Sequence, residues 1–361
     1  MKSKMNAKFK FELLRVLVSF ALAISIAVVI ILFVSEEPGI AIQKILLGPL
    51  QNTRYFGNVI ELMIPLLFTG LAVSLIFRVK VFNLAVEGMF YAGGLAAAVV
   101  GCLVTLPMGL HWVVALVVAG IAGAIVAFIP GVLKSKFHAN EVVSSLMLNY
   151  VIFNFGDYIL KTFIRDSKST FVTSYKYKDT AKLPKLFGDI HIGFVIIIVL
   201  LIVAYVVIYK TRWGYELRIT EENQLFSKYS GVKVSSVLIL VQLFGGVIAG
   251  IGGGAHILGA TQRFSFAWRS GFGWDGIIVA IIARYNPKLI PLGAFILSYL
   301  RIGSDIMRRG TDVQNEVVAI IQGIIIILLV SDGFLQGYRK KLTVKEVMEN
   351  QKKENSEEVA M

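Results

Sequence analysis

The chain has 361 residues, of which 56% are hydrophobic and 16% charged, and its formal net charge is +13. Its mean hydropathy is +0.74. So much apolar surface cannot be hidden inside one water-soluble domain, which excludes that class of protein. A single cysteine, Cys102, excludes a disulfide framework. The basic residues lie between the apolar runs, so the positive charge indicates loops near anionic lipid rather than nucleic-acid binding.

Apolar runs follow one another along the chain, and a helix needs about 20 apolar residues to cross the hydrocarbon of a bilayer. The clear runs are 13–34, 56–77, 82–105, 109–133, 142–164, 192–209, 233–257 and 315–337. Two more lie between 271 and 306, separated at Asn286, and the first is short for a full crossing. The sequence predicts an all-α integral membrane protein whose transmembrane domain, 1–337, has about ten helices, with nine as the alternative.

Basic residues flank the apolar region at both ends, within 2–10 and within 339–341. Because Lys and Arg are enriched in cytoplasmic loops, both termini are expected in the cytoplasm, which requires an even number of crossings. Ten crossings place the loop 211–232 inside and the loop 165–191 outside, against the bias of its lysines. The charged segment 338–361 is expected to be a disordered cytoplasmic tail.

Two short patterns recur five predicted spans apart. The tetrapeptide Asn-Glu-Val-Val opens the fifth span at 140–143 and the tenth at 315–318. A carboxylate followed by glycine lies early in the third span, at Glu87, and early in the eighth, at Asp275. An odd offset makes the two copies enter the membrane from opposite sides. The patterns therefore predict an inverted repeat of spans 2–5 and 7–10, an arrangement found in many transporters.

Small residues recur every four positions on two predicted spans, where they let helix backbones approach closely. They are Gly246, Gly250 and Gly254 on one span and Gly93, Ala97 and Gly101 on the other. This spacing predicts close helix contacts within the membrane.

Polar residues at membrane depth are costly and often functional. Glu87 and Asp275 are the clearest examples, and with Asn83 and Asn149 they are the candidate residues of a translocation path. The alternative is structural, because a carboxylate can also satisfy backbone amides at a broken helix. Both interpretations stay open at the level of the sequence.

No constellation for catalysis or metal binding is evident in the sequence. The four histidines are scattered and the single cysteine lies in an apolar run. No nucleophile lies beside a base, and no G-x-x-x-x-G-K-[ST] motif for nucleotide phosphates occurs. The chain is therefore expected to be neither an enzyme nor a cofactor or metal protein. If ATP drives it, another chain must bind the nucleotide.

The loop 211–232 has strong local signals. Thr220 is an expected N-cap, followed by Glu221 and Glu222 in a first turn where the helix dipole favours anions. Gly231 can close the same helix. The loop is predicted to hold a cytoplasmic helix of two to three turns, with an ordinary interfacial helix as the alternative.

Four segments of the chain resemble, in order, the landmarks of one family. TRWGYELRITEENQLFSKYSGV at 211–232 is similar to the cytoplasmic coupling segment of ABC transporter permeases for branched-chain amino acids, simple sugars and nucleosides. VFNLAVEGMF at 81–90, NEVVSSLMLNYV at 140–151 and GWDGIIVAIIARYNP at 273–287 resemble its other landmarks. The resemblance covers about 40–337 and is greatest to the nucleoside branch.

The resemblance implies the permease subunit of an importer in a bacterial plasma membrane, with nucleosides as substrate. It also implies an ATPase subunit, a second permease subunit in a heterodimer and an extracellular substrate-binding lipoprotein. A simple-sugar importer of the ribose or galactose type is the alternative, and a stand-alone secondary transporter is less favoured. The expected ATPase-coupling residues are Arg218, Glu222, Asn223, Leu225, Phe226 and Tyr229.

Overall fold

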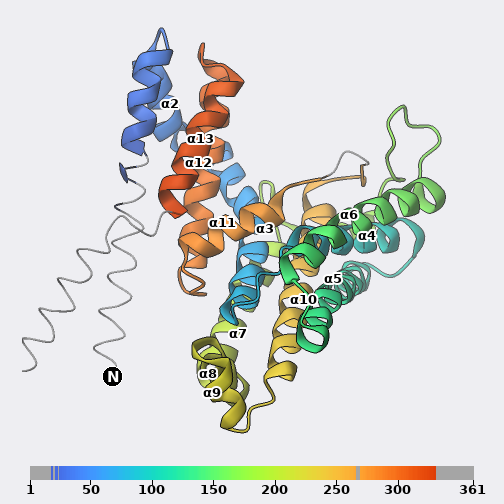
Figure 1. The fold of residues 1–361 in the computed structure, drawn as a ribbon. Coiled ribbons are helices and arrows are strands. Elements are labelled where there is room, and N and C mark those ends of the chain that lie inside the picture. The colour runs from blue at the N-terminus through green and yellow to red at the C-terminus, as the bar shows by residue number, and fades with distance from the viewer. Residues whose placement is uncertain (1–17, 19–20, 23, 266–268, 331–361) are drawn as a thin grey trace, which may run out of the picture. The chain divides into compact units, whose positions relative to one another are not determined.

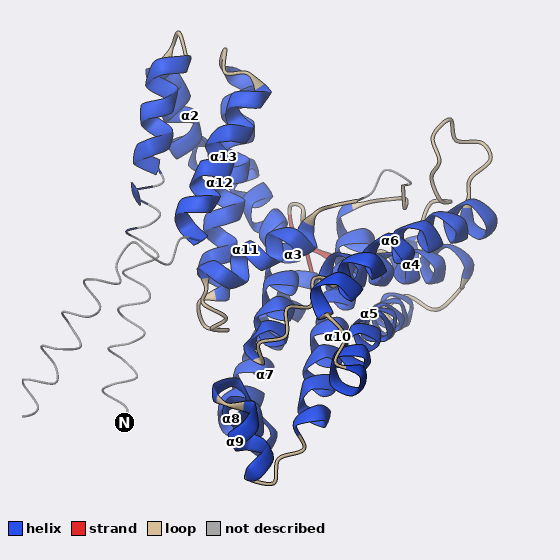
Figure 2. Ribbon diagram, in the orientation of Figure 1, coloured by secondary structure: helices blue, strands red, loops and turns tan. Residues whose placement is uncertain are grey.

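A computed structural model describes residues 18, 21–22, 24–265 and 269–330 (Figure 1). Parts of the first and last predicted spans and the whole predicted tail 338–361 lie outside these residues. The chain divides into two compact units, 39–311 and the pair of segments 1–38 and 312–361. Helices supply almost all of the described regular structure (Figure 2).

The larger unit consists of helices joined mostly by short connections. Its helices are α2 (Pro38–Gln51, whose first residue belongs to the other unit), α3 (Thr53–Arg78), α4 (Val86–Leu103), α5 (Leu110–Phe137), α6 (Glu141–Ile159), α7 (Gly193–Lys210), α8 (Arg212–Glu222), α9 (Gln224–Tyr229), α10 (Val234–Ala260), α11 (Phe272–Ile282) and α12 (Ile290–Gly310). A π-helical turn, Leu160–Ile164, extends α6. The other unit contains the helix Ile24–Val34 and α13 (Asn315–Val330).

Within the described residues, 7 helices are long and apolar enough to cross a membrane. They are α3, α4, α5, α6 with its π turn, α7, α10 and α12. The helices Ile24–Val34 and α11 are apolar but shorter. The all-α membrane class is therefore confirmed, while the number of crossings stays a prediction.

Helix α2 was not expected, because its residues mix polar and apolar types without forming a long apolar run. It buries Ala41, Ile45 and Gly48. The hydroxyl of Tyr299 on α12 donates a hydrogen bond to the carbonyl of Leu46. This helix is therefore held by packing on α12 rather than by a sequence signal of its own.

Two central helices, α3 and α10, organise the larger unit. Helix α10 packs against α4 and α5, α3 packs against α11 and α12, and α3 and α10 pack against each other. Exchanging α3 with α10, α4 with α11 and α5 with α12 leaves this set of contacts unchanged. The packing thus has the symmetry that the predicted repeat requires.

The connections predicted to face the cytoplasm gather at one end of the larger unit. The side chain of Gln224 donates to the carbonyl of Val79 at 3.0 Å. The rings of Phe77 and Tyr285 lie 6.0 Å apart. The turn after α3, the α8–α9 segment and the turn after α11 are therefore neighbours, as a common cytoplasmic side demands.

The loop 165–191 lies at the ends of α4 and α10 remote from α8 and α9. The amide of Lys178 donates to the carbonyl of Gly101 at 3.0 Å. Arg263 pairs with Asp166 at 2.6 Å, and the Lys168 amide and this guanidinium hold the pKa of Asp166 below its usual range. A short antiparallel hairpin, β1 (Lys185–Phe187) with β2 (Ile190–His191), ends the loop.

The four-residue spacing of small residues produces close backbone contacts between helices. A Cβ atom on Gly250 of α10 would lie 2.3 Å from the carbonyl oxygen of Ala119 on α5. One on Gly93 of α4 would lie 2.2 Å from the carbonyl oxygen of Gly250. The predicted close packing is confirmed at these positions.

We expect Gly253→Ala to lower the melting temperature of the protein in detergent. The new Cβ atom would lie 1.9 Å from the carbonyl oxygen of Phe90, and overpacking of this kind costs typically about 1–3 kcal/mol. Gly57→Ala is the matched control, because nothing lies within 4 Å of its added Cβ atom. Equal melting temperatures for the two variants would contradict the contact between α4 and α10.

Candidate functional site

Two helix N-termini meet where the carboxylate of Glu87, in the first turn of α4, reaches the first turn of α11. Its Oε1 accepts from the Gly271 amide at 2.9 Å and its Oε2 from the Gly273 amide at 2.6 Å. The helix dipole of α11 favours a negative charge at this end. Gly271 has a φ of +72°, which glycine adopts without strain. We call this meeting point the junction, defined by Glu87 and the amides of Gly271 and Gly273.

The start of α4 is held by amide side chains. Oδ1 of Asn149 on α6 accepts from the Gly88 amide at 2.9 Å, and its Nδ2 donates to the Leu84 carbonyl at 3.0 Å. Oδ1 of Asn83 accepts from the Ala85 amide at 2.9 Å. These bonds satisfy the amides that the break between α3 and α4 leaves without helical partners.

Asn83 also links the break to α10. Its Nδ2 donates to Oε1 of Gln242 at 2.8 Å, and both side chains are buried. Nε2 of Gln242 is buried and has no hydrogen-bond partner among the described residues. The Gln242 side chain is therefore only half satisfied, which is uncommon for a buried amide.

Asp275, in the first turn of α11, forms a two-point ion pair with Arg301 of α12. The distances are 2.5 Å from Nη1 to Oδ2 and 2.6 Å from Nη2 to Oδ1. Sequence reasoning missed Arg301, although a lone basic residue inside an apolar stretch was a signal that could have identified it. The pair balances one charge of each sign inside the helix bundle.

The four predicted path residues thus lie around the starts of α4 and α11, and each is at most 5% exposed. Their side chains are hydrogen-bonded to backbone groups or to Gln242, or ion-paired with Arg301, so in this conformation they hold the helix starts in place. Helix α11 has 11 residues and is about 16 Å long, too short to cross about 30 Å of hydrocarbon. The arrangement is that of a discontinuous membrane helix.

Metal binding has no support in the described part of the chain. No group of three or more His, Cys, Asp or Glu side chains that could hold an ion occurs there.

The loop 211–232 forms two helices rather than one. The side chain of Thr211 caps α8 by accepting from the Gly214 amide at 3.1 Å. The side chain of Asn223 caps α9 by accepting from the Phe226 amide at 3.0 Å. Thr220, the expected cap, lies inside α8 and donates to the carbonyl of Glu216 at 2.8 Å, so that prediction was wrong.

The end of α9 agrees with expectation. Gly231 has a φ of +83°, and its amide donates to the Lys228 carbonyl at 3.2 Å. The closing role predicted for this glycine is confirmed.

The second helix and its flanks present an open apolar surface. Leu225 is 69% exposed, Phe226 61% and Tyr229 89%. Glu222 and Asn223 are exposed at the bend beside them. We call Glu222, Leu225, Phe226 and Tyr229 the coupling surface.

Arg218 does not belong to this open surface. Its guanidinium donates to the carbonyl of Ile208 and lies 5.8 Å from the centre of the Tyr209 ring. It therefore fastens α8 to the end of α7, and its contact with an ATPase stays a prediction.

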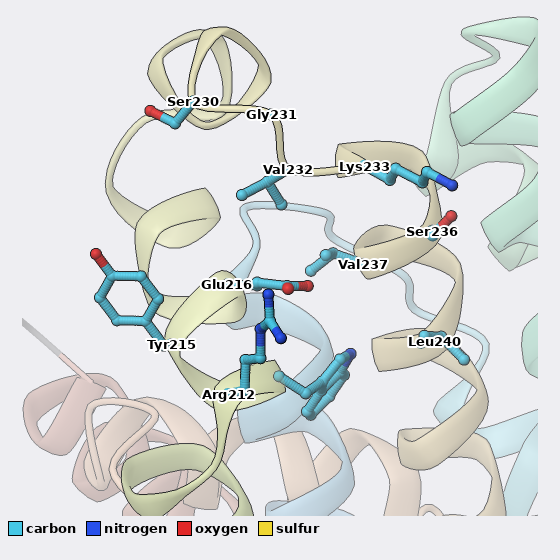
Figure 3. Close-up of a pocket in the computed structure, with 11 residues that line it drawn as sticks. Arg212, Tyr215, Glu216, Ser230, Gly231, Val232, Lys233, Ser236, Val237 and Leu240 are labelled. Carbon is cyan, nitrogen blue, oxygen red and sulfur yellow. The ribbon is translucent and has the colours of Figure 1, made fainter.

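A pocket of about 460 Å³ lies between α8 and the first turns of α10 (Figure 3). Arg212, Tyr215 and Glu216 line it from α8, and Ser236 and Leu240 line it from α10. The α8–α9 segment is therefore bonded to the end of α3 on one side. On the other side it touches α10, where the rings of Trp213 and Phe244 lie 5.3 Å apart, and the pocket opens beside this contact.

We expect Glu87→Gln to lower both the melting temperature and the rate of uptake. A carboxamide accepts through one atom only, so one bond to the Gly271 or Gly273 amide is lost. Hydrogen bonds to charged groups are worth about 1.5–3 kcal/mol, and we expect uptake to fall by about tenfold or more. Exposed Glu37→Gln is the control.

Asp275→Asn should act in the same direction, because it leaves Arg301 without its anionic partner. The measurements are the same melting curves and initial rates of uptake. Wild-type uptake by both Glu87→Gln and Asp275→Asn would show that neither carboxylate is needed for transport.

Comparison with known proteins places the chain in a family. Residues 55–330 match the family described as the branched-chain amino acid transport system permease component. The glucose ABC transporter permease protein of Haloferax volcanii is 31% identical over 301 residues, which cover 80% of this chain and 79% of that protein. The guanosine ABC transporter permease protein of Bacillus subtilis is 32% identical over 298 residues, covering 80% and 85%.

A nucleoside ABC transporter permease protein of Lactococcus lactis is 24% identical over 342 residues, which cover 90% of this chain and 92% of that protein. No solved structure matches the chain significantly. The family match spans the junction and the α8–α9 segment. The chain therefore belongs to the branched-chain amino acid transport system permease family, as a permease subunit of an ABC transporter.

Proposed function

We propose that the chain is the permease subunit of an importer that carries nucleosides across a bacterial plasma membrane. The observation that carries this proposal is the coupling surface, an ordered and exposed apolar face on the side where the predicted cytoplasmic connections gather. A permease without a nucleotide-binding motif must receive its driving force through such a contact. The partner that binds there is an ATPase subunit.

The substrate class rests on the relatives. Proteins named for guanosine and nucleoside transport match most of the chain. The relative from Haloferax volcanii is named for glucose, and it keeps a simple-sugar importer as the second candidate. A stand-alone secondary transporter is disfavoured, because it would have no use for the coupling surface.

The loop 165–191 is the surface proposed for the extracellular substrate-binding lipoprotein. Phe171 is 76% exposed and Phe187 71%, and lysines lie between them in the sequence. Aromatic side chains among basic ones suit a partner with an acidic rim around an apolar centre. A second permease subunit in a heterodimer and two cytoplasmic termini complete the proposed assembly.

The junction is the proposed moving part of the translocation path. Glu87, Asn83, Asn149 and Asp275 are buried in this conformation. If α11 separates from α4, the carboxylate of Glu87 and the amides of α11 become available to a polar substrate. The four residues therefore line the translocation path in our proposal, and they become accessible to substrate only after α11 and α4 separate.

We expect Phe226→Ala to weaken the association of the ATPase and to reduce uptake. Phe226 is exposed at the centre of the coupling surface, and truncating a central anchor of an interface costs about 1–2 kcal/mol or more. The measurement is co-purification of the ATPase with the tagged permease, alongside uptake. Substrate preference should stay unchanged.

Tyr150→Ala is the control, since this side chain is 66% exposed on α6, outside the coupling surface. Normal co-purification and normal uptake by a Phe226→Ala, Glu222→Ala double variant would contradict the proposed contact.

A further inference from the structure

The α8–α9 segment is fastened to the end of α3 by two backbone-directed bonds. Nε2 of Gln224 donates to the Val79 carbonyl at 3.0 Å. Nζ of Lys80 donates to the Glu222 carbonyl at 3.3 Å. Both bonds reach the first residues of the break between α3 and α4. The two bonds therefore connect the segment to this break.

Arg78 joins the same place to α7. Its Nη2 donates to the Tyr209 hydroxyl at 3.0 Å, and its guanidinium carbon lies 5.5 Å from the centre of the Tyr209 ring. Its Nε lies 3.7 Å from the Glu221 carboxylate. The Arg78 side chain is only 8% exposed, so these contacts replace solvation by water.

Basic side chains from more than one element lie near the ring of Tyr209. The guanidinium of Arg218 on α8 also lies near its ring, at 5.8 Å. The ring of Tyr205 lies 5.0 Å away, and Nζ of Lys288, in the turn between α11 and α12, lies 4.7 Å from the Tyr205 ring. We call Arg78, Tyr205, Tyr209, Arg218 and Lys288 the Tyr209 cluster. A cation and the aromatic ring that it faces attract each other most strongly where water is excluded.

The Tyr209 cluster therefore includes residues from the connections that precede α4 and follow α11. Arg78 is the last residue of α3, and the break that follows leads through Asn83 into α4. Lys288 lies in the turn that follows α11. Movement at this cluster reaches the two helices whose N-termini form the junction, and it reaches them from their cytoplasmic connections.

Resting on the proposed function, we propose that Arg78 and Tyr209 are positioning residues that transmit movement of the coupling surface to α4 and α11. They touch neither ATPase nor substrate in this account. The segment has room to move beside its Trp213–Phe244 contact with α10, because a pocket of about 460 Å³ lies between α8 and the first turns of α10 (Figure 3).

The hydrogen bonding of Arg78 gives the cluster a second possible arrangement. Its buried Nε and Nη1 have no hydrogen-bond partner among the described residues. A buried guanidinium with unused donors gains bonds when a nearby acceptor moves closer. The Glu221 carboxylate, at 3.7 Å, is such an acceptor, so a small rearrangement of these two side chains exchanges one set of contacts for another while the segment stays joined to the end of α3.

The first test separates coupling from assembly. Arg78→Gln and Tyr209→Leu are expected to co-purify with the ATPase at the wild-type level. The ATP hydrolysed per substrate imported should rise about fivefold or more, the lower end of typical coupling between sites. Tyr209→Phe keeps the ring for both guanidiniums and loses the hydroxyl, so it should give a smaller rise.

Tyr150→Leu, the same chemical change on the exposed face of α6, should leave the ratio unchanged. A wild-type ratio in Arg78→Gln and Tyr209→Leu would overturn the proposal. If Phe226→Ala meanwhile loses the ATPase, the coupling surface stands and only the transmission role fails. If Phe226→Ala also behaves as wild type, the proposed function fails first.

A second test does not depend on the folding of a truncated cluster. In a Cys102→Ser background, Lys80→Cys with Gln224→Cys is joined by a short bis-maleimide. Because these residues belong to one moving body in our account, the cross-linked protein should keep more than about half of its uptake. Cross-linking Glu216→Cys to Ser236→Cys across the pocket should arrest uptake. Arrest by the first cross-link, or full uptake with the second, would overturn the proposal.

Discussion

A carboxylate inside a membrane protein must be neutralised or fully hydrogen-bonded, and this constraint governs the centre of the structure. Glu87 meets it by accepting from the amides of Gly271 and Gly273 at the start of α11. In water such a cap would be a modest contribution to stability. In the membrane no solvent replaces it, so the hydrogen bonds of Glu87 link the start of α11 to the start of α4.

The surrounding packing follows from the same need. The first turns of α4 and α11 each carry a carboxylate, and each lies against the central helix of the other half of the fold. Glycines on α10 and α4 allow these helices to approach at backbone distance. Close packing around α3 and α10 thus surrounds a centre that is held by hydrogen bonds. Hydrogen bonds can exchange partners, whereas tightly packed side chains cannot easily slide past one another.

Much of this arrangement could be predicted from the sequence, because it depends on composition and spacing. The length of the apolar runs predicted the helices, and the four-residue spacing of small residues predicted the close helix contacts. Gly231 predicted where α9 ends. The cap of α9 was misplaced by three residues, since Thr220 and Asn223 have similar capping chemistry and only the bend between α8 and α9 decides between them. Helix α2 has no pattern strong enough to predict it.

Contacts between residues distant in the sequence could not be predicted. The pairing of Asp275 with Arg301, and the stacking of Arg78 and Arg218 on Tyr209, require the helices to be placed first. Spacing identified the carboxylates at membrane depth but not their partners. For this reason the sequence could not decide between a path role and a structural role for Glu87.

The most direct test of the account is uptake by proteoliposomes that contain this chain with its second permease subunit, its ATPase and its binding protein. We predict uptake of labelled uridine that requires ATP, is competed by adenosine and is not competed by ribose. The chain reconstituted alone should move no substrate under a proton or sodium gradient. Gradient-driven, substrate-specific flux through the lone chain would contradict the account.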